Sequence, residues 1–139
     1  MIHARLTAEP LDLAAHLAVL DDARSGAVAT FVGRVRDHDP EADGPVVALE
    51  YSAHPDAEAV LARIAAEVAA GPDVLGVAVS HRVGRLEVGG TSVVAAVSTA
   101  HRAPAFDACR VLVERVKAEL PVWKRQLLAD GSHVWVGSA

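Results

Sequence analysis

The predicted fold is organised around HRAPAFDACRVLVERVKAELPVWKRQ, residues 101–126. Apolar residues recur through this stretch at the spacing of an amphipathic helix: Phe106, Cys109, Val113, Val116 and Leu120. Pro121 cannot continue the helix, because it lacks a backbone N–H and its ring clashes with the preceding turn. The sequence therefore predicts a long helix that packs one face on a core and ends before a short C-terminal segment.

Lys117 and Lys124 are the only lysines in the chain, against eleven arginines. At about 100° per residue, Lys117 lies roughly 20° from the direction of Phe106, within the predicted apolar stripe. A desolvated lysine can lose its proton, whereas an arginine in practice cannot. Two interpretations remain: a pair of titratable amines in a functional site, or a lysine stem that packs on the core while its ammonium reaches water.

Length and composition predict one domain over residues 1–139 of the α+β class. The chain is 52% hydrophobic with only 4% aromatic residues, which excludes a disordered protein. A single cysteine excludes an internal disulfide and is consistent with a reducing compartment. No apolar run has the length of a membrane span and no signal-peptide pattern is present, so we expect a cytoplasmic protein.

Charge is distributed unevenly along the chain. Residues 1–79 hold five Lys/Arg and thirteen Asp/Glu, whereas residues 80–139 hold eight and five. The net charge of -5 argues against general nucleic-acid binding, while the basic second half leaves room for a local anion site.

Periodicity and turn residues predict the remaining elements. Strands are expected at 2–6, 26–35, 46–53, 74–83, 123–128 and 134–136, and helices at 7–22 and 55–70. The first helix is expected to bury Leu13, Leu17 and Leu20 on one face. The segments 86–88 and 92–98 are expected to form a hairpin, because Gly89-Gly90 between them is a two-residue turn signal. Residues 38–45 are a loop, and the element order predicts a mixed, largely antiparallel sheet.

Several common chemistries lack their sequence patterns. No phosphate-binding loop, GxGxxG, HExxH, paired cysteines or G-x-S-x-G occurs, so we expect no metal site and no nucleotide site of these kinds. Cys109 lies on the apolar stripe, where an inert core thiol is expected.

Basic residues gather at the ends of the predicted elements. Arg34 and Arg36 alternate at a strand end, so their side chains should point the same way. His101 and Arg102 open the long helix, where backbone N–H groups favour anions. With Lys117, Lys124 and Arg125, they predict one pocket for a small anionic or phosphate-bearing ligand. The alternative is a scatter of ordinary surface cations.

The motifs FVGRVRDHD, LEYSAH, HRVGRLEVGG, STAHRAPAFDACR, VKAELPVWKRQ and DGSHVWV follow one another between residues 31 and 136. In this order they resemble the MoaE family, the large catalytic subunit of molybdopterin synthase. The resemblance implies an α/β-hammerhead fold and a sulfurtransferase that works as a homodimer within a heterotetramer. A small ubiquitin-like carrier would insert a thiocarboxylated Gly-Gly tail, and its sulfur would convert cyclic pyranopterin monophosphate, the substrate, into molybdopterin. No permanently bound cofactor is implied.

The resemblance also implies roles for individual residues. Lys117 would lie nearest the carrier's terminal carbonyl and act as the catalytic residue with Lys124. The remaining substrate-binding positions would be Phe31, Arg34, Val35, Arg36, His101, Arg102, Arg125 and Gln126. A lysine crowded by the arginines of such a pocket should have a lowered pKa, since like charge and desolvation both disfavour the ammonium.

The chain also departs from the family pattern. Gln126 stands where many relatives have glutamate, Gly90 replaces the usual acidic residue of the hairpin turn, and the chain ends at Ala139, short of the usual tail. Activity is nonetheless expected, with proton transfer by a lysine. The rival hypothesis is a non-enzymatic module that binds a ubiquitin-like protein without chemistry.

Overall fold

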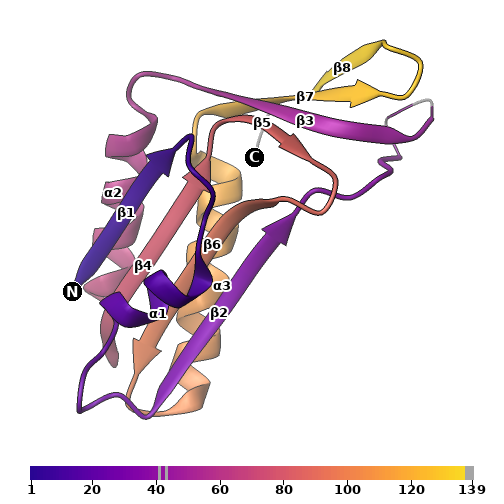
Figure 1. Ribbon diagram of the computed structural model, residues 1–139. Coiled ribbons are helices and arrows are strands. Elements are labelled where there is room, and N and C mark those ends of the chain that lie inside the picture. The colour runs from indigo at the N-terminus through magenta and orange to yellow at the C-terminus, as the bar shows by residue number, and fades with distance from the viewer. Residues whose placement is uncertain (41, 43, 137–139) are drawn as a thin grey trace.

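Two four-stranded sheets and three helices make up the part of the chain that this computed structural model describes, residues 1–40, 42 and 44–136 (Figure 1). The strands are β1 (Ile2–Thr7), β2 (Ala27–Arg34), β3 (Val46–Ala53), β4 (Val74–Arg82), β5 (Gly84–Glu87), β6 (Thr91–Thr99), β7 (Val122–Leu128) and β8 (His133–Val136). The helices are α1 (Leu13–Val19), α2 (Ala57–Ala69) and α3 (Arg102–Glu119). The predicted α+β class is confirmed. Residues 41 and 43 of the predicted loop, and the chain end at Ala139, lie outside this description.

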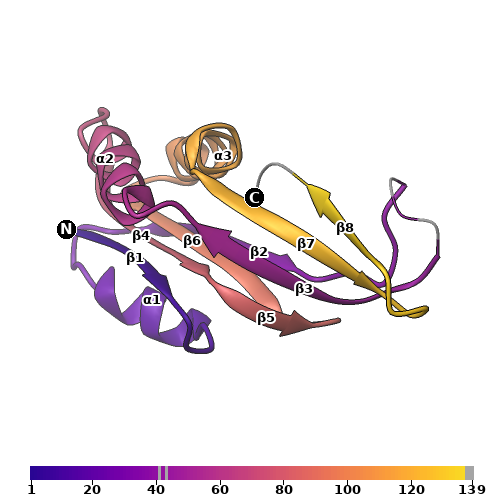
Figure 2. The same cartoon turned by 90° about the horizontal axis from the view of Figure 1, so that it is seen from above.

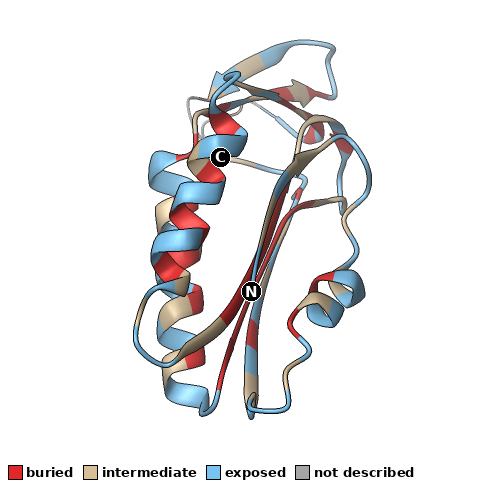
Figure 3. Cartoon of the chain, turned by 90° about the vertical axis from the view of Figure 1, so that its left-hand side faces the viewer, coloured by how far each residue is buried: buried red, intermediate tan, exposed pale blue. Residues whose placement is uncertain are grey.

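Sheet A has the strand order β1-β4-β6-β2, with β1 parallel to β4 and the other neighbours antiparallel. Helices α2 and α3 cover one face and α1 lies on the other (Figure 2). Because both faces are covered, the central strands β4 and β6 are buried along nearly their whole length and do not alternate between buried and exposed positions. The buried positions face one another between the helices and the strands (Figure 3).

Sheet B has the order β5-β3-β7-β8 and is antiparallel throughout. It lies across one end of sheet A and of α3 (Figure 1). Its inner face carries a second apolar cluster, which includes Val35, Leu49, Tyr51 and Leu86. A pocket lies where the two sheets meet.

The predicted hairpin is wrong, because the two segments it joins belong to different sheets. Strand β5 pairs with β3, whereas β6 pairs with β2 and β4. The glycines do form a turn: Gly90 N donates to Glu87 O at 2.9 Å, and Gly89 has a φ of 85° that favours glycine. Both glycines also bond the backbone of Val35, so the turn carries the chain from one sheet to the other.

Most of the predicted stripe of helix α3 is confirmed: Cys109, Val116 and Leu120 are buried and Val113 packs partly buried on the core, whereas Phe106 is the exception. The buried residues of the helix are Ala105, Cys109, Leu112 and Val116, while Phe106 is 66% exposed. Ala105 and Leu112 take inward positions beside Cys109 and Val116, and this rotation of the helix leaves Phe106 toward solvent. Lys117 shares the direction of Phe106 and is accordingly exposed.

Helix α1 is shorter than predicted and buries a different side chain. It begins after Asp12, whose Oδ1 accepts the Ala14 N–H at 3.0 Å. Leu20 is buried as expected, but Leu17 is 39% exposed and His16 takes the inward position. No helix in the described part of the chain is long and apolar enough to cross a membrane.

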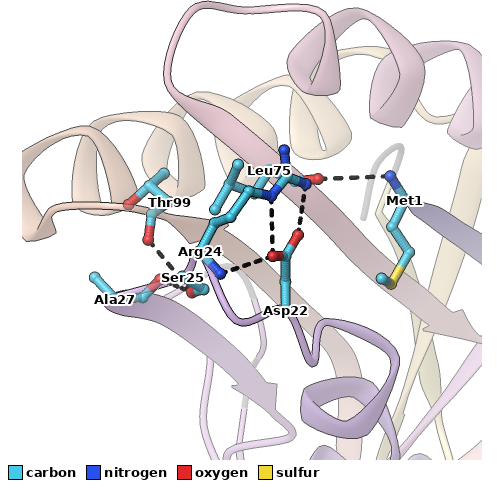
Figure 4. Close-up of polar contacts among 7 residues, drawn as sticks. All are labelled: Met1, Asp22, Arg24, Ser25, Ala27, Leu75 and Thr99. Atoms are coloured by element: carbon cyan, nitrogen blue, oxygen red, sulfur yellow. Dashed lines mark hydrogen bonds and ion pairs between the residues drawn. The ribbon is translucent and has the colours of Figure 1, made fainter.

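Polar contacts stabilise the end of sheet A that lies opposite sheet B, where α3 begins (Figure 4). Ser25 Oγ donates to Ala27 O at 3.2 Å and lies 3.3 Å from Thr99 O, and Arg24 pairs with Asp22 at 2.7 Å. A side chain at Gly26 would collide with the Ala100 carbonyl oxygen, so only glycine fits. These contacts fix the chain just before His101.

Candidate functional site

A pocket of about 300 Å³ lies between the two sheets and the C-terminal end of α3. The end of β2 and the segment after it form one wall, Lys117 comes from the last turn of α3, and sheet B supplies the opposite wall. The predicted site residues that line it are Phe31, Arg34, Arg36, Lys117, Lys124 and Gln126.

The pocket is cationic. Arg34, Arg36, Lys117 and Lys124 all line it, with Asp39 as a carboxylate on the same lining. Arg36 and Arg34 are two residues apart at the strand end and reach the same pocket, as the alternation predicted. The Arg34 guanidinium is held by Gly89 O, 3.3 Å from Nη2, whereas Arg36 lies 4.0 Å from Asp39 with 65% of its side chain exposed. Four cations around one cavity provide a site for an anionic ligand.

The pKa of Lys117 is shifted by its surroundings in the pocket. Although its side chain is exposed overall, partial desolvation by the surrounding protein lowers its pKa from the ordinary lysine value. The charge of Lys124 lowers the pKa further, and Glu114 opposes both effects. The predicted direction is therefore confirmed. The positive charge that lowers the pKa of Lys117 comes from Lys124, and not from the arginines that the sequence suggested.

Strand β7 places Lys124 and Gln126 on the inner face of sheet B, opposite Tyr51 and Leu49 of β3. Gln126 is only 2% exposed, and its Oε1 accepts no hydrogen bond from any described residue. Arg125 alternates to the outer face, where it pairs with Glu50 at 2.8 Å and stacks over Trp135 at 5.6 Å. Arg125 is therefore not part of the pocket, contrary to the prediction.

Val35 lies under the pocket and not in its lining. Its side chain is 3% exposed within the apolar cluster of sheet B, and its backbone N–H and carbonyl bond Gly90 and Gly89. Val35 thus holds Arg34 and Arg36 in place.

His101 and Arg102 do not lie near this pocket in the same chain. They open α3, while Lys117 is in its last turn, fifteen residues after Arg102. At 1.5 Å of rise per residue, the two ends are about 22 Å apart. The residues that were expected to share one pocket therefore lie at opposite ends of α3 within one protomer.

Sequence reasoning missed several lining residues, among them Tyr51 and Ser92. Tyr51 and Ser92 come from β3 and β6 and line the pocket beside Lys117. Burial raises the pKa of Tyr51, and the Ser92 hydroxyl beside it acts in the opposite direction. The available signals were that Tyr51 is the one tyrosine of the chain and that it lies within the LEYSAH motif.

Comparisons with known proteins identify the family of this chain. The family model described as MoaE protein matches residues 6–119. The molybdopterin synthase catalytic subunit of Nostoc sp. is 43% identical over 134 residues, which cover 94% of this chain and 79% of that protein.

Solved structures give the same result. The crystal structure of molybdopterin synthase from Staphylococcus aureus superposes with a TM-score of 0.87 at 31% identity and covers 96% of both chains. A Helicobacter pylori structure, described as a complex of subunits 1 and 2 of molybdopterin-converting factor, shares the fold with a TM-score of 0.75 at 19% identity, over 97% of this chain and 89% of that one. The chain therefore belongs to the MoaE protein family.

Proposed function

We propose that this chain is the catalytic subunit of a molybdopterin synthase. It would transfer sulfur from the C-terminal thiocarboxylate of a small ubiquitin-like carrier to cyclic pyranopterin monophosphate, and molybdopterin would be the product. The observation that carries the proposal is the pocket in which Arg34, Arg36, Lys117 and Lys124 surround one cavity. Family membership supports this reaction over others that a cationic pocket could serve.

The chemistry requires cations more than a protein nucleophile. A thiocarboxylate and a cyclic phosphate are both anions, and the thiocarboxylate sulfur is itself the nucleophile. As the sulfur bonds to a carbon of the substrate, a carbon–oxygen bond at that carbon breaks and the oxygen leaves on the phosphate or as water. Water then cleaves the resulting thioester, so that the substrate keeps a thiol and the carrier leaves as a carboxylate; two such transfers supply the two sulfurs of the dithiolene. The chain's own thiol is unsuited to a nucleophilic role, because Cys109 is buried and burial raises its pKa.

Lys117 is the proposed catalytic residue. An ammonium close to the carrier's terminal carbonyl stabilises the oxyanion that forms when the thioester is attacked. The lowered pKa of Lys117 also brings its proton exchange closer to neutral pH, which suits an acid or base. Lys124, from the facing strand, supplies a second positive charge to the same cavity.

A second copy of the chain completes the proposed site. His101 and Arg102 are too far from Lys117 to bind the same small molecule within one protomer. A homodimer in which α3 of one copy begins near the pocket of the other would bring the pair to the phosphate. Two catalytic subunits with one carrier each make a heterotetramer, and the complex described for the Helicobacter pylori relative supports a partner of this kind.

The decisive experiment mixes the purified chain with thiocarboxylated carrier and cyclic pyranopterin monophosphate, and measures molybdopterin. Product formation is expected. Tight carrier binding with no product over many hours would instead support the non-enzymatic docking module.

The homodimer has its own test by complementation. Lys117→Ala and the double variant His101→Ala/Arg102→Ala are each expected to be inactive alone. When the two are mixed and allowed to exchange subunits, some dimers contain one intact site and activity returns. No recovery, despite subunit exchange shown by mass spectrometry, would contradict a shared site. Arg110→Ala, an exposed cation elsewhere on α3, is the control.

A further inference from the structure

His81 is a buried histidine that the proposed mechanism leaves without a role. It lies near the end of β4, paired with Leu6 of β1 and Val93 of β6, and is 2% exposed. Its ring meets Tyr51 edge-on with centroids 4.9 Å apart. A fully buried imidazole beside a catalytic pocket is either a packing element or a functional group.

One hydrogen bond fixes the tautomer of this ring. Nδ1 lies 2.7 Å from the carbonyl oxygen of Arg82, and a carbonyl can only accept, so Nδ1 carries the proton. In neutral His81 the other nitrogen, Nε2, therefore presents a lone pair. Among the described residues, the structure gives Nε2 no hydrogen-bond donor.

A small cavity separates His81 from Lys117. It offers about 10 Å³ to water, the size of a single water site, and its polar lining residues are Tyr51, His81, Ser92 and Lys117. Tyr51, Ser92 and Lys117 also line the main pocket, so the cavity opens toward the catalytic lysine. Its other walls are apolar side chains from sheet A and α3.

Burial, together with the nearby charge of Lys117, favours the neutral form of His81. Burial lowers its pKa most, the bond to Arg82 O partly offsets this, and the positive charge of Lys117 lowers it further. The other titratable groups around Lys117 and His81 are Tyr51 from β3, Lys124 from β7 and Glu114 from α3. Across the main pocket, Lys117 also faces Arg34, Arg36, His38 and Asp39. An ammonium and a neutral imidazole with a free lone pair thus share one water-sized space.

We propose that His81 is a positioning residue for Lys117, whose ammonium it orients by accepting a hydrogen bond through one water molecule in the small cavity. No proton is transferred in this role; Nε2 accepts and Lys117 keeps its proton until the reaction takes it. The role rests on the proposed function, in which Lys117 acts on the carrier's terminal carbonyl. A neutral acceptor favours the charged lysine, so loss of the acceptor must lower the pKa of Lys117 further.

Two substitutions separate this role from simple packing. His81→Asn places an amide N–H where Nδ1 donates to Arg82, but leaves no acceptor at the position of Nε2. His81→Gln keeps an oxygen at the position of Nε2 and gives up the bond to Arg82. Asparagine preserves the bond to Arg82 O that fixes the ring in the fold, whereas glutamine preserves the acceptor that the positioning role needs.

The first readout does not depend on activity. Lysine labelled with ¹³C gives only two side-chain signals in this chain, from Lys117 and Lys124, and Lys124→Arg assigns them. The pH titration of Lys117 is expected to move to lower pH in His81→Asn and to stay at the wild-type position in His81→Gln. An unchanged Lys117 titration in His81→Asn would overturn the proposal.

The second readout is the rate of sulfur transfer. His81→Asn should lower kcat by roughly tenfold, the value of one hydrogen bond to a charged group, with KM for the carrier unchanged. The inflection of the pH–rate profile should move to lower pH with the NMR titration. A wild-type chain without transferase activity would refute the proposed function, while the NMR result would still decide the role of His81.

His16 provides a matched control. It is also buried, and its Nδ1 also lies 2.7 Å from a backbone carbonyl, that of Asp12, but it lies on the α1 side of sheet A and bonds Ser80 at 2.7 Å. His16→Asn should leave the Lys117 titration and kcat unchanged. Equal shifts in both variants would show a general effect of losing a buried histidine and would overturn the proposal.

Lys117→Met tests the same coupling with His81 intact, should His81→Asn not fold. Removal of the lysine charge should raise the pKa of His81, which ¹⁵N–¹H correlation spectra of the ring can follow together with its tautomer. A His81 titration that is identical with and without Lys117 would also overturn the proposal.

Discussion

Replacement of Lys117 by alanine should abolish sulfur transfer and leave the fold intact. Lys117 is exposed in the last turn of α3, so its loss leaves no cavity in the core. Removing a cation from a helix C-terminus costs about 0.3–1 kcal/mol, and alanine's higher helix propensity returns a few tenths. Loss of the repulsion between Lys117 and Lys124 also stabilises the variant, as the alanine does. The free energy of unfolding should therefore change by less than about 1 kcal/mol.

The rate should fall much further than the stability. Removal of a group that stabilises an oxyanion or transfers a proton typically slows a reaction by about 100- to 1,000-fold. Single-turnover reactions with excess enzyme would follow the conversion of carrier thiocarboxylate to carboxylate by intact-mass spectrometry, with urea unfolding measured in parallel. The matched control is Arg110→Ala on the same helix. A rate within about fivefold of wild type would refute the assigned role of Lys117.

Three further predictions concern the pocket and the fold. Arg36→Ala should weaken binding of the substrate by about tenfold or more in calorimetry without destabilising the chain, because its guanidinium is largely exposed; unchanged affinity would remove it from the site. Gln126→Glu should alter the pH–rate profile little, and its inflection should lie below the free-lysine value of about 10.4, since the pKa of Lys117 is lowered; a large gain with a new acidic titration would show that a carboxylate matters. Gly26→Ala should destabilise the chain by roughly 1–3 kcal/mol in urea, because its Cβ meets the Ala100 carbonyl; an unchanged midpoint would contradict that contact.

The sequence by itself determined the local elements and the family. Strands β4 and β6, helices α2 and α3, and the stop at Pro121 were all predicted, because each depends on periodicity or on a single residue's backbone geometry. Six ordered motifs also sufficed to indicate the MoaE family, which the comparisons confirmed. The lowered pKa of Lys117 was predicted in direction, since partial desolvation of any ammonium has that effect.

Only the tertiary structure decided which side chains meet. Arg125 differs from Lys124 and Gln126 by one position in a strand, and that single step moves it to the outer face of sheet B. The glycine turn at Gly89 looked like a hairpin, but strand pairing depends on partners such as β3 that lie far away in the sequence.

The rotation of α3 and the separation of its ends were decided in the same way. Helix α3 buries Ala105 and Leu112 and exposes Phe106 and Lys117, a rotation that the helical period alone did not specify. His101 caps the start of α3 and Lys117 lies in its last turn. Because a helix of eighteen residues is rigid, these two side chains stay far apart within one protomer. Local sequence fixes the period of an element, whereas the direction that each residue faces depends on contacts with distant segments.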